Sequence, residues 1–379
     1  MILGTRGIPA RHGGFETFAE DLSLYLVGRN HQVTVYCQTE SDSEPCADEW
    51  QGVRRVCIPA GDSPAGTVKF DWNATRHASR QAGVVLTLGY NTGVFSLLYR
   101  LRHLPNVMNM DGIEWQREKW SIPQRSWLRF NEWASARFAN HLVADHPSIS
   151  AHLQRHTPAY KISVIPYGAD AVLSAPQAPL EAFNLRPNGY NLLIARAEPE
   201  NSILEIVQAS SASCLSRPLV VLGNYAEKYP FHQKVKRAAG SNILFLGAIF
   251  DREIVHALRF HASAYIHGHQ VGGTNPSLVE SLAAGNAIVA HDNRFNRWVA
   301  GKGARFFTSR EDLTEILRSL EESPDQLVEM REASRRRHQE EFTQERVMQA
   351  YEEVLQQVAE NARLGVRNAV RTSQVGNWY

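Results

Sequence analysis

The chain has 379 residues, which is enough for two domains of ordinary size. Hydrophobic residues make up 43% and charged residues 21%, and a net charge of +1 gives no overall attraction to nucleic acid or membranes. No apolar run reaches the roughly 20 residues that span a bilayer, no signal peptide precedes the first predicted strand, and the four cysteines lack metal-binding spacing. We therefore expect a cytoplasmic protein with reduced thiols and no nucleic-acid partner.

Short apolar strands alternate with helical segments through the first half of the chain. Strands are predicted over residues 2–3, 33–36, 53–58, 84–88, 107–110, 142–144 and 162–165. The first is so short that we expect either a natural start a few residues upstream or a frayed edge. The alternation is typical of a parallel, doubly wound sheet, whose ligands bind at the carboxyl ends of the strands.

A glycine-rich loop follows the first predicted strand. Residues 4–14 read Gly-Thr-Arg-Gly-Ile-Pro-Ala-Arg-His-Gly-Gly, and an amphipathic helix with Glu16 and Glu20 near its positive end comes next. The order of strand, glycine loop and helix resembles that of a phosphate-binding loop. The loop lacks the Gly-x-Gly-x-x-Gly spacing, which argues against a bound dinucleotide.

Two carboxylates follow the strand predicted at residues 107–110. The run Met110-Asp111-Gly112-Ile113-Glu114 places Asp111 and Glu114 where they could reach a ligand cleft. An ordinary turn or helix-cap carboxylate explains either residue equally well.

The helix predicted from Gln124 to Ala139 shows two faces. Its apolar face, which we expect in the core, consists of Trp127, Phe130, Ala134 and Phe138. Beside it lies a basic stripe of Arg125, Arg129, Trp133 and Arg137. Such a stripe suits an anionic membrane surface. The small number of charges favours the alternative, a solvated arginine face with Trp133 packed between domains.

Residues 171–188 contain three prolines and are predicted to be a linker. A second alternating series begins after them, with strands over residues 191–195, 219–222, 242–245, 265–267, 287–290 and 304–307. We therefore expect an α/β protein of two Rossmann-like, doubly wound domains facing a cleft. Their predicted limits are 1–170 and 189–341, followed by a helix at 342–362 and a frayed tail at 363–379.

The most informative segment reads His-Gly-His-Gln-Val-Gly-Gly-Thr-Asn-Pro-Ser-Leu-Val-Glu over residues 267–280. It follows a short apolar strand, and Asn275 and Pro276 are suited to begin a helix. Free N–H groups and the positive helix end would form an anion site, and Glu280, one turn into the helix, could accept hydrogen bonds from sugar hydroxyls. The alternative is a simple glycine turn with a solvated glutamate.

Arg196 directly follows the strand predicted at residues 191–195. An arginine at a strand end is well placed to bind phosphate, although an isolated arginine more often forms a surface ion pair. His267 and His269 lack a third ligand at suitable spacing, and the sequence contains no Asp-x-Asp motif. We therefore expect no metal and no other cofactor.

These motifs resemble those of the retaining family 4 glycosyltransferases, and most closely a bacterial subgroup of polysaccharide rhamnosyltransferases. The subgroup has loops like Gly-Thr-Arg-Gly-Ile-Pro, Asp-Gly-x-Glu-Trp, Glu-Pro-Glu-Asn and His-Gly-His-Glu-Val-Gly-Gly-Thr-Asn-Pro-Ser-Leu. This chain has Gln270 where the subgroup often has glutamate, Gly272 where the wider family has its first glutamate, and Asn201 in place of a family lysine.

The resemblance implies the GT-B fold, with an acceptor-side first domain, a nucleotide-sugar-binding second domain and a final helix that crosses back to the first. Glu280 would hold the ribose, and Arg196 would neutralise the diphosphate. Asp111 would lie near the donor sugar. The remaining donor-binding positions would be Gly13, Gly14, Asn201, Gly272, Gly273, Thr274 and Asn275.

The resulting prediction is a metal-independent enzyme that transfers a deoxyhexose, specifically rhamnose, from a nucleotide-sugar donor to a lipid-linked glycan in polysaccharide synthesis. Such an enzyme would be cytoplasmic, with peripheral contact to the inner face of the membrane. Two alternatives remain open. One is a module that binds a nucleotide sugar without turnover, and the other is a dinucleotide-dependent dehydrogenase.

Overall fold

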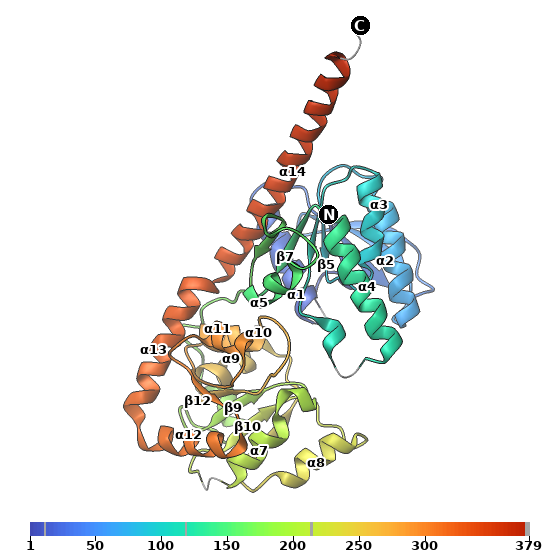
Figure 1. Ribbon diagram of the computed structural model, residues 1–379. Coiled ribbons are helices and arrows are strands. Elements are labelled where there is room, and N and C mark those ends of the chain that lie inside the picture. The colour runs from blue at the N-terminus through green and yellow to red at the C-terminus, as the bar shows by residue number, and fades with distance from the viewer. Residues whose placement is uncertain (11–12, 118–119, 213–214, 376–379) are drawn as a thin grey trace. The chain divides into compact units, whose positions relative to one another are not determined.

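A computed structural model describes residues 1–10, 13–117, 120–212 and 215–375, with side chains to residue 364 (Figure 1). The chain divides into two compact units. Unit 1 comprises Met1–Pro166 and the residues from Met348 onward, and unit 2 comprises Tyr167–Val347.

Unit 1 is built on an eight-stranded sheet with the order β3-β4-β2-β1-β5-β6-β7-β8, in which only β3 is antiparallel to its neighbour. Its strands are β1 Ile2–Leu3, β2 Thr34–Thr39, β3 Cys46–Trp50, β4 Val53–Pro59, β5 Val85–Leu88, β6 Asn106–Asn109, β7 His141–Ala144 and β8 Ile162–Val164. Its helices before the C-terminal one are α1 Gly14–Gly28, α2 Pro64–Ala78, α3 Ser96–Leu101, α4 Ile122–Phe138 and α5 Pro147–Leu153, with 3-10 turns at η1 Gly93–Phe95, η2 Glu114–Gln116 and η3 Ala159–Lys161. Every residue of β6 and β7 is buried, as expected for parallel strands covered on both faces.

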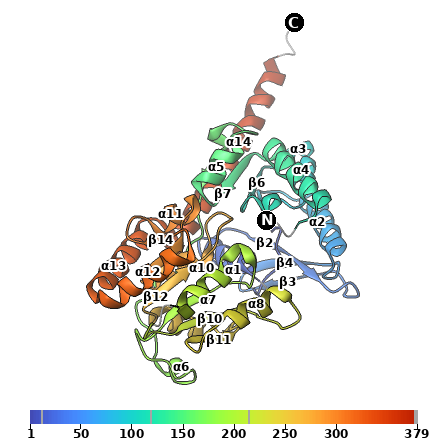
Figure 2. The same cartoon turned by 60° about the horizontal axis from the view of Figure 1, so that its bottom comes forward.

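Strand β3 was not predicted. Figure 2 shows it at the edge of the sheet beside β4. Four of its five residues are exposed, so it lacks the apolar pattern by which the other strands were recognised. It pairs with β4 in register, and the Arg55 Nε of β4 donates to Asp48 Oδ1 at 2.7 Å. Cys37, Cys46 and Cys57 are free thiols, while Cys214 lies outside the described residues.

Unit 2 is built on a six-stranded parallel sheet with the order β11-β10-β9-β12-β13-β14. The strands are β9 Asn191–Ile194, β10 Leu219–Leu222, β11 Ile243–Gly247, β12 Ala264–His267, β13 Ala287–His291 and β14 Arg305–Phe307. The helices are α6 Ala178–Glu181, α7 Ile203–Ala212, α8 Pro230–Ala238, α9 Arg252–Phe260, α10 Pro276–Ala283, α11 Arg294–Ala300, α12 Arg310–Glu322 and α13 Pro324–Glu341, with a 3-10 turn at η4 Pro199–Asn201. The doubly wound α/β fold predicted for both halves is confirmed.

Each sheet reverses its strand order at one point. In unit 2 the first strand, β9, lies between β10 and β12, and in unit 1 the first strand, β1, lies between β2 and β5. The loops that leave two adjacent strands in opposite directions open a crevice at the carboxyl end of the sheet, where doubly wound proteins bind their ligands. In unit 2 these are the loops after β9 and β12, so topology alone directs attention to Arg196 and to the segment after His267.

The predicted linker is part of unit 2. Residues 171–188 contain helix α6, whose Leu180 is buried in the same core as Tyr190 and Leu278, and the Val172 N–H donates to the Ala283 carbonyl at 3.0 Å. The prolines in this segment indicated a linker. The sequence alone does not show that apolar residues such as Leu180 have a core to pack against.

Helix α14, Gln344–Val375, belongs to unit 1 from Met348 onward. Tyr351 anchors it: its ring lies 4.8 Å from that of Phe18, and its hydroxyl accepts a hydrogen bond from Asn109 Nδ2 at 2.7 Å. The helix continues past residue 362, where we expected a frayed tail to begin, because no proline interrupts the sequence there. Among the described residues, no helix combines the length and apolar composition needed to cross a membrane.

Candidate functional site

Strand β12, the glycine loop after it and helix α10 form the predicted order of strand, loop and helix. Asn275 is the N-cap of α10, with its Oδ1 accepting the Ser277 N–H at 3.0 Å, and Pro276 is the first residue of the helix. Gly272 has a φ of 126°, a region that side chains disfavour, which explains the glycine at this turn.

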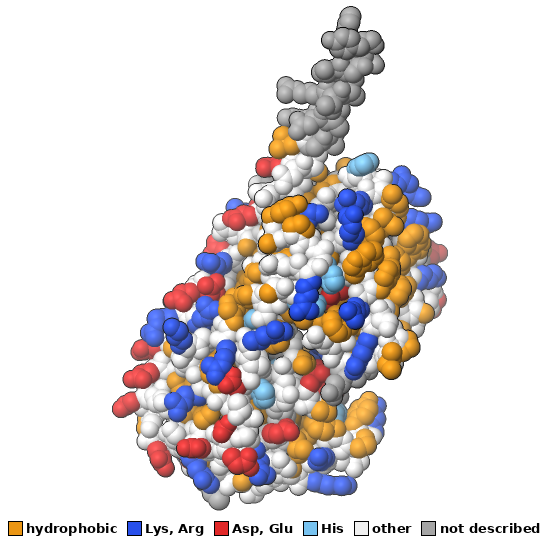
Figure 3. Space-filling view, viewed as in Figure 1, with side chains coloured by type: hydrophobic (Ala, Val, Ile, Leu, Met, Phe, Trp, Pro, Cys, Tyr) orange, Lys and Arg blue, Asp and Glu red, His pale blue; other side chains and the backbone are white. Residues whose placement is uncertain are grey.

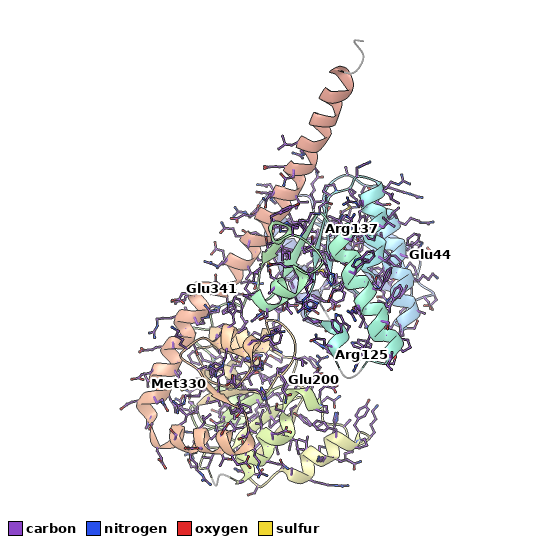
Figure 4. All side chains as sticks on the ribbon, viewed as in Figure 1. Glu44, Arg125, Arg137, Glu200, Met330 and Glu341 are labelled. Carbon is purple, nitrogen blue, oxygen red and sulfur yellow. The ribbon has the colours of Figure 1, made fainter. Side chains whose placement is uncertain are left out.

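The loop is held on both sides by side chains of neighbouring segments. Ser202 Oγ donates to the Gly268 carbonyl at 2.8 Å, and the side-chain amides of Asn293 and Asn296 donate to the His269 carbonyl at 2.9 and 2.8 Å. A Cβ at Gly268 would lie 2.1 Å from the Asn201 carbonyl oxygen, so only glycine allows this approach. Figure 4 labels Glu200, whose carbonyl accepts the Gln270 N–H at 3.0 Å and links the loops after β9 and β12. The loop is therefore fixed before any ligand arrives.

The N–H groups at the turn remain available. Within the described part of the chain, neither Gly272 nor Gly273 donates its N–H to an acceptor. Both precede the N-terminal, positive end of α10. Fixed, unpaired N–H groups next to a helix N-terminus form a binding site for an anion such as a phosphate.

Arg196 is exposed at the end of β9, and no carboxylate in the described residues pairs with its guanidinium. Asn201, which is 2% exposed, donates its side-chain amide to the Arg196 carbonyl at 2.9 Å. The structure thus gives Asn201 a role in shaping the loop that carries Arg196, and a direct contact between its amide and a donor stays a prediction. A free cation at a strand end adjacent to an anion-binding loop can bind the same anion.

Glu280 has a partner that the sequence did not reveal. Arg259, on α9, forms an ion pair with Glu280 Oε2 and donates from Nη2 to Ser277 Oγ at 3.2 Å. The Arg259 side chain is only 7% exposed, whereas that of Glu280 is 44% exposed. One carboxylate oxygen is therefore fixed, and the partly exposed carboxylate can still accept a hydrogen bond from a ligand hydroxyl. No local pattern signals such a partner, because Arg259 is one of many arginines on amphipathic helices.

His267 and His269 support the loop through packing. Their rings stack with centroids 4.5 Å apart and an interplanar angle of 10°. Burial holds the pKa of His267 well below its usual value, and the nearby His269 and His291 act in the same direction, so the imidazole is neutral at pH 7. No group of three possible metal ligands that includes these histidines occurs among the described residues.

In unit 1 the loop after β1 is hydrogen bonded to side chains of the helix that follows it, α1. Glu16 Oε1 accepts the Arg6 N–H at 3.2 Å, and Glu20 Oε2 accepts the Ala10 N–H at 2.6 Å. Gly13 is the N-cap of α1 and Gly14 is its first residue, whereas the preceding Arg11 and His12 lie outside the described residues. Two N–H groups that could have served an anion are thus already paired with carboxylates. Donor contact by Gly13 and Gly14 stays a prediction.

Asp111 is held in a special backbone conformation at the end of β6. Its φ is 47°, and its N–H donates to Asn109 Oδ1 at 2.8 Å. Glu114, the other carboxylate in this run, pairs with Arg117 at 2.9 Å. Aspartate adopts this left-handed conformation more readily than most residues, and a contact between Asp111 and a donor sugar stays a prediction.

The outward face of α4 differs from the prediction. Trp127 and Phe130, expected in the core, are each 44% exposed. Apart from Leu128, the buried residues of the helix are small or polar. Asn131 Oδ1 accepts the Val94 N–H at 2.9 Å, and a Cβ at Gly93 would overlap Ser135 Oγ. Such close packing leaves no room for aromatic rings, which therefore point outward.

Of the predicted basic stripe on α4, two arginines contact other residues and the other two members are exposed. Figure 4 labels Arg125 and Arg137, toward opposite ends of the helix. Arg125 donates to the Arg117 carbonyl at 3.2 Å, and the Arg129 guanidinium lies 5.5 Å from the centre of the Trp115 ring. Arg137 and Trp133 are exposed. Their docking role stays a prediction.

One cluster in the described residues could hold a metal ion. Glu132, His152 and His156 place ligand atoms within 4.8 Å of one another. Glu132 already accepts hydrogen bonds from Trp115 Nε1 at 2.9 Å and from His152 Nε2 at 2.9 Å. This arrangement satisfies a buried carboxylate by itself, so it fits a structural network as well as a metal site.

Comparison with known proteins shows the fold. A family model described as "Domain of unknown function (DUF1972)" matches residues 1–170, and no curated protein matches the chain. Sucrose-phosphate synthase from Thermosynechococcus elongatus is 16% identical with a TM-score of 0.78, over 94% of this chain and 98% of that one. HepE from Anabaena in complex with UDP is 14% identical with a TM-score of 0.72, over 94% and 98%. An α,α-trehalose-phosphate synthase (UDP-forming) from Burkholderia xenovorans is 11% identical with a TM-score of 0.71, over 94% and 99%. The predicted GT-B fold with two Rossmann-like domains is confirmed.

Proposed function

We propose that this protein is a glycosyltransferase that takes a sugar from a nucleotide-sugar donor whose diphosphate binds to unit 2. The observation that carries the proposal is the anion site at the point where the strand order of unit 2 reverses. Its free N–H groups at Gly272 and Gly273, the unpaired guanidinium of Arg196 and the carboxylate of Glu280 lie on loops and a helix that follow two adjacent strands.

Each group has a distinct role in this proposal. The backbone of residues 272–275 binds the diphosphate, and the partly exposed carboxylate of Glu280 accepts hydrogen bonds from the ribose. Arg196 stabilises the negative charge that grows on the diphosphate as the glycosidic bond breaks. Asp111 in unit 1 is proposed to contact the donor sugar. The family resemblance implies that the configuration of the transferred sugar is retained.

The similar structures support a nucleotide-sugar donor. HepE has been solved in complex with UDP-glucose as well as with UDP, and both synthases are sugar-phosphate synthases by name. The sugar itself is proposed from sequence motifs. Residues 4–9 and 267–278 resemble the rhamnosyltransferase subgroup, so we propose a deoxyhexose, and specifically rhamnose, as the transferred group.

The proposed acceptor is a lipid-linked glycan in surface or exopolysaccharide synthesis. Such an acceptor would place the enzyme in the cytoplasm at the inner face of the membrane, in peripheral contact with lipid.

One observation favours a second candidate, a module that binds nucleotide sugars without turnover. Asn201 replaces a family lysine, and its side-chain amide donates to the Arg196 carbonyl within the loop after β9. In the sequence of that loop, residues 195–202, Arg196 is the one basic residue. A dehydrogenase is less well supported, because the loop after β1 lacks the dinucleotide spacing and two of its N–H groups are bound to Glu16 and Glu20.

A donor panel distinguishes these functions. The full chain is incubated with nucleoside-diphosphate sugars that differ in base and sugar, each with a lipid-linked acceptor, and products are identified by mass spectrometry. Transfer of a deoxyhexose supports the proposal, binding without transfer or hydrolysis supports the second candidate, and a nicotinamide absorbance change with a hydroxy substrate would overturn both.

We expect activity to survive a chelator. Complete loss of activity that one divalent ion restores would contradict metal independence and direct attention to Glu132, His152 and His156.

A further inference from the structure

Helices α2, α3 and α4 of unit 1 carry an unusual concentration of exposed apolar side chains. The three helices lie side by side (Figures 1 and 2). Half of the large apolar side chains that are exposed in the described part of the chain lie on them. We call this set the α2–α4 surface: Val68, Trp72, Leu97, Leu101, Ile122, Trp127, Phe130 and Trp133.

The apolar residues form a continuous area. Figure 3 shows hydrophobic side chains gathered over these helices with Lys and Arg side chains around them. On α4 the rings of Trp127, Phe130, Trp133 and Phe138 follow one another with centroid distances of 6.2, 5.9 and 6.1 Å. Ile122 at 80% and Leu101 at 68% are the most exposed members. Large contiguous apolar areas on a protein surface mark contact with a partner or a membrane.

The close packing of α4 makes this exposure a stable feature. Its inner face is occupied by Asn131, Ser135 and Ala134, which leave no space for the rings to turn inward. The Trp127 Nε1 donates to the Asn91 carbonyl at 3.0 Å, so the polar atom of this indole is satisfied while its ring stays half exposed.

The exposed charged side chains on the same helices are all positive. The exposed ionic side chains are Lys69, Arg76, Arg100, Arg129 and Arg137. The acids on these helices are turned inward: Glu132 is 2% exposed, and Asp71 accepts a hydrogen bond from Thr92 at 2.9 Å and lines an internal pocket with it. Cationic side chains around exposed tryptophan and aliphatic residues match the interface of an anionic bilayer.

We propose that the α2–α4 surface inserts its apolar side chains into the interface of an anionic lipid bilayer, with its basic side chains bound to lipid headgroups. A second copy of this chain is a poorer occupant, because pairing the surface with itself would bring the same five cations together. The proposed lipid-linked acceptor supplies a reason for docking. Lipid binding itself requires neither donor nor acceptor, so it can succeed or fail independently of the proposed function.

The test uses sedimentation of the full chain with vesicles of phosphatidylcholine, with and without phosphatidylglycerol. Two separate variants probe the surface. Lys69→Ser/Arg100→Ser/Arg137→Ser removes three cations, and because each basic residue contributes about fivefold near an anionic surface, binding should weaken by about 100-fold. Arg129 is left in place because it packs on Trp115. Leu101→Ser/Ile122→Ser/Phe130→Ser should weaken binding roughly tenfold or more.

Matched controls come from exposed residues elsewhere. Arg186→Ser/Arg305→Ser/Arg318→Ser removes three exposed cations, and Tyr160→Ser/Leu173→Ser/Phe250→Ser removes three highly exposed apolar groups. Loss of binding to anionic vesicles in both surface variants, with both controls unchanged and all thermal unfolding curves alike, supports the proposal. Equal binding by wild type and both surface variants would overturn it. So would a change in self-association by light scattering while vesicle binding is unaltered, because a second copy would then be the occupant.

Discussion

Both units place a glycine loop where the strand order of the sheet reverses, yet the two loops use their N–H groups differently. In unit 1 the N–H groups of Arg6 and Ala10 are paired with the carboxylates of Glu16 and Glu20. In unit 2 the N–H groups of Gly272 and Gly273 are left without acceptors in the described residues, and the loop is held through the carbonyl oxygens of Gly268 and His269 and the N–H of Gln270.

This difference favours the loop of unit 2 as the one that binds an anion. A carboxylate beside a glycine loop satisfies the donors and adds negative charge where a phosphate would lie. Among the described residues, no carboxylate is bonded to the turn at Gly272 and Gly273, and the acid in the first turns of α10, Glu280, is neutralised by Arg259. Two segments with the same order of strand, glycine loop and helix therefore have different electrostatic character, and this is why we propose that the diphosphate binds to unit 2.

The largest effect is expected at Arg196. Arg196→Ala should lower kcat by about 10²–10³-fold, because an arginine near the leaving diphosphate gains interaction as charge develops in the transition state. Arg196→Lys should restore activity only in part, since lysine cannot form two parallel hydrogen bonds. Steady-state kinetics with the identified donor measure this, and Arg318→Ala is the matched control for loss of an exposed arginine in unit 2. A change in donor Kd alone, with kcat preserved, would show that Arg196 only anchors the ground state.

The next largest effect is expected at Glu280. Loss of a charge-assisted hydrogen bond costs about 1.5–3 kcal/mol, so Glu280→Gln should raise the donor KM by about 10- to 100-fold. It should also lower the free energy of unfolding, because buried Arg259 loses its anionic partner.

The double variant Arg259→Met/Glu280→Gln separates these two effects of Glu280. It removes the uncompensated cation and should recover stability in a denaturant titration without recovering donor KM. An unchanged donor KM in folded Glu280→Gln would rule out the proposed ribose contact.

A smaller effect tests the two glycine loops against each other. Gly272→Ala puts a side chain at a φ of 126°, where strain of about 1–3 kcal/mol should displace the free N–H groups and raise donor KM roughly tenfold. Gly14→Ala adds a methyl group at the first residue of α1, where it would meet no other atom of the described residues within 4 Å, so its effect on donor KM should be clearly smaller. Isothermal titration with the nucleoside diphosphate compares the two. A larger loss of affinity in Gly14→Ala would reverse the assignment of the loops.

The parts that could be predicted from the sequence depend on local signals. Strand β10 was located at Leu219–Leu222 because buried parallel strands read as continuous apolar runs. The start of α10 was located because Asn275 caps an N–H group in the first turn and Pro276 suits the first helical position. Arg196 could be assigned to the carboxyl end of a strand because it follows β9 by two residues.

The parts that could not be predicted depend on partners distant in the chain. The ion pair of Arg259 with Glu280 and the hydrogen bond from the Arg6 backbone N–H to Glu16 both depend on how elements pack, and no spacing in the sequence encodes them. The aromatic residues of α4 were assigned to the core because apolar periodicity does not show which face of a helix packs closely. Gly93 decided this, since it admits Asn131 and Ser135 but no ring.

Hydrogen exchange of the full chain, with and without the nucleoside diphosphate of the active donor, tests the central assignment directly. Binding to the loop of unit 2 should slow exchange in peptides that cover residues 196–202 and 268–280, because the free N–H groups of Gly272 and Gly273 become hydrogen bonded. Peptides that cover residues 4–10 should show little change, because their loop is already paired with Glu16 and Glu20. Protection confined to residues 4–10, with none at 268–280, would contradict the assignment of the diphosphate site to unit 2.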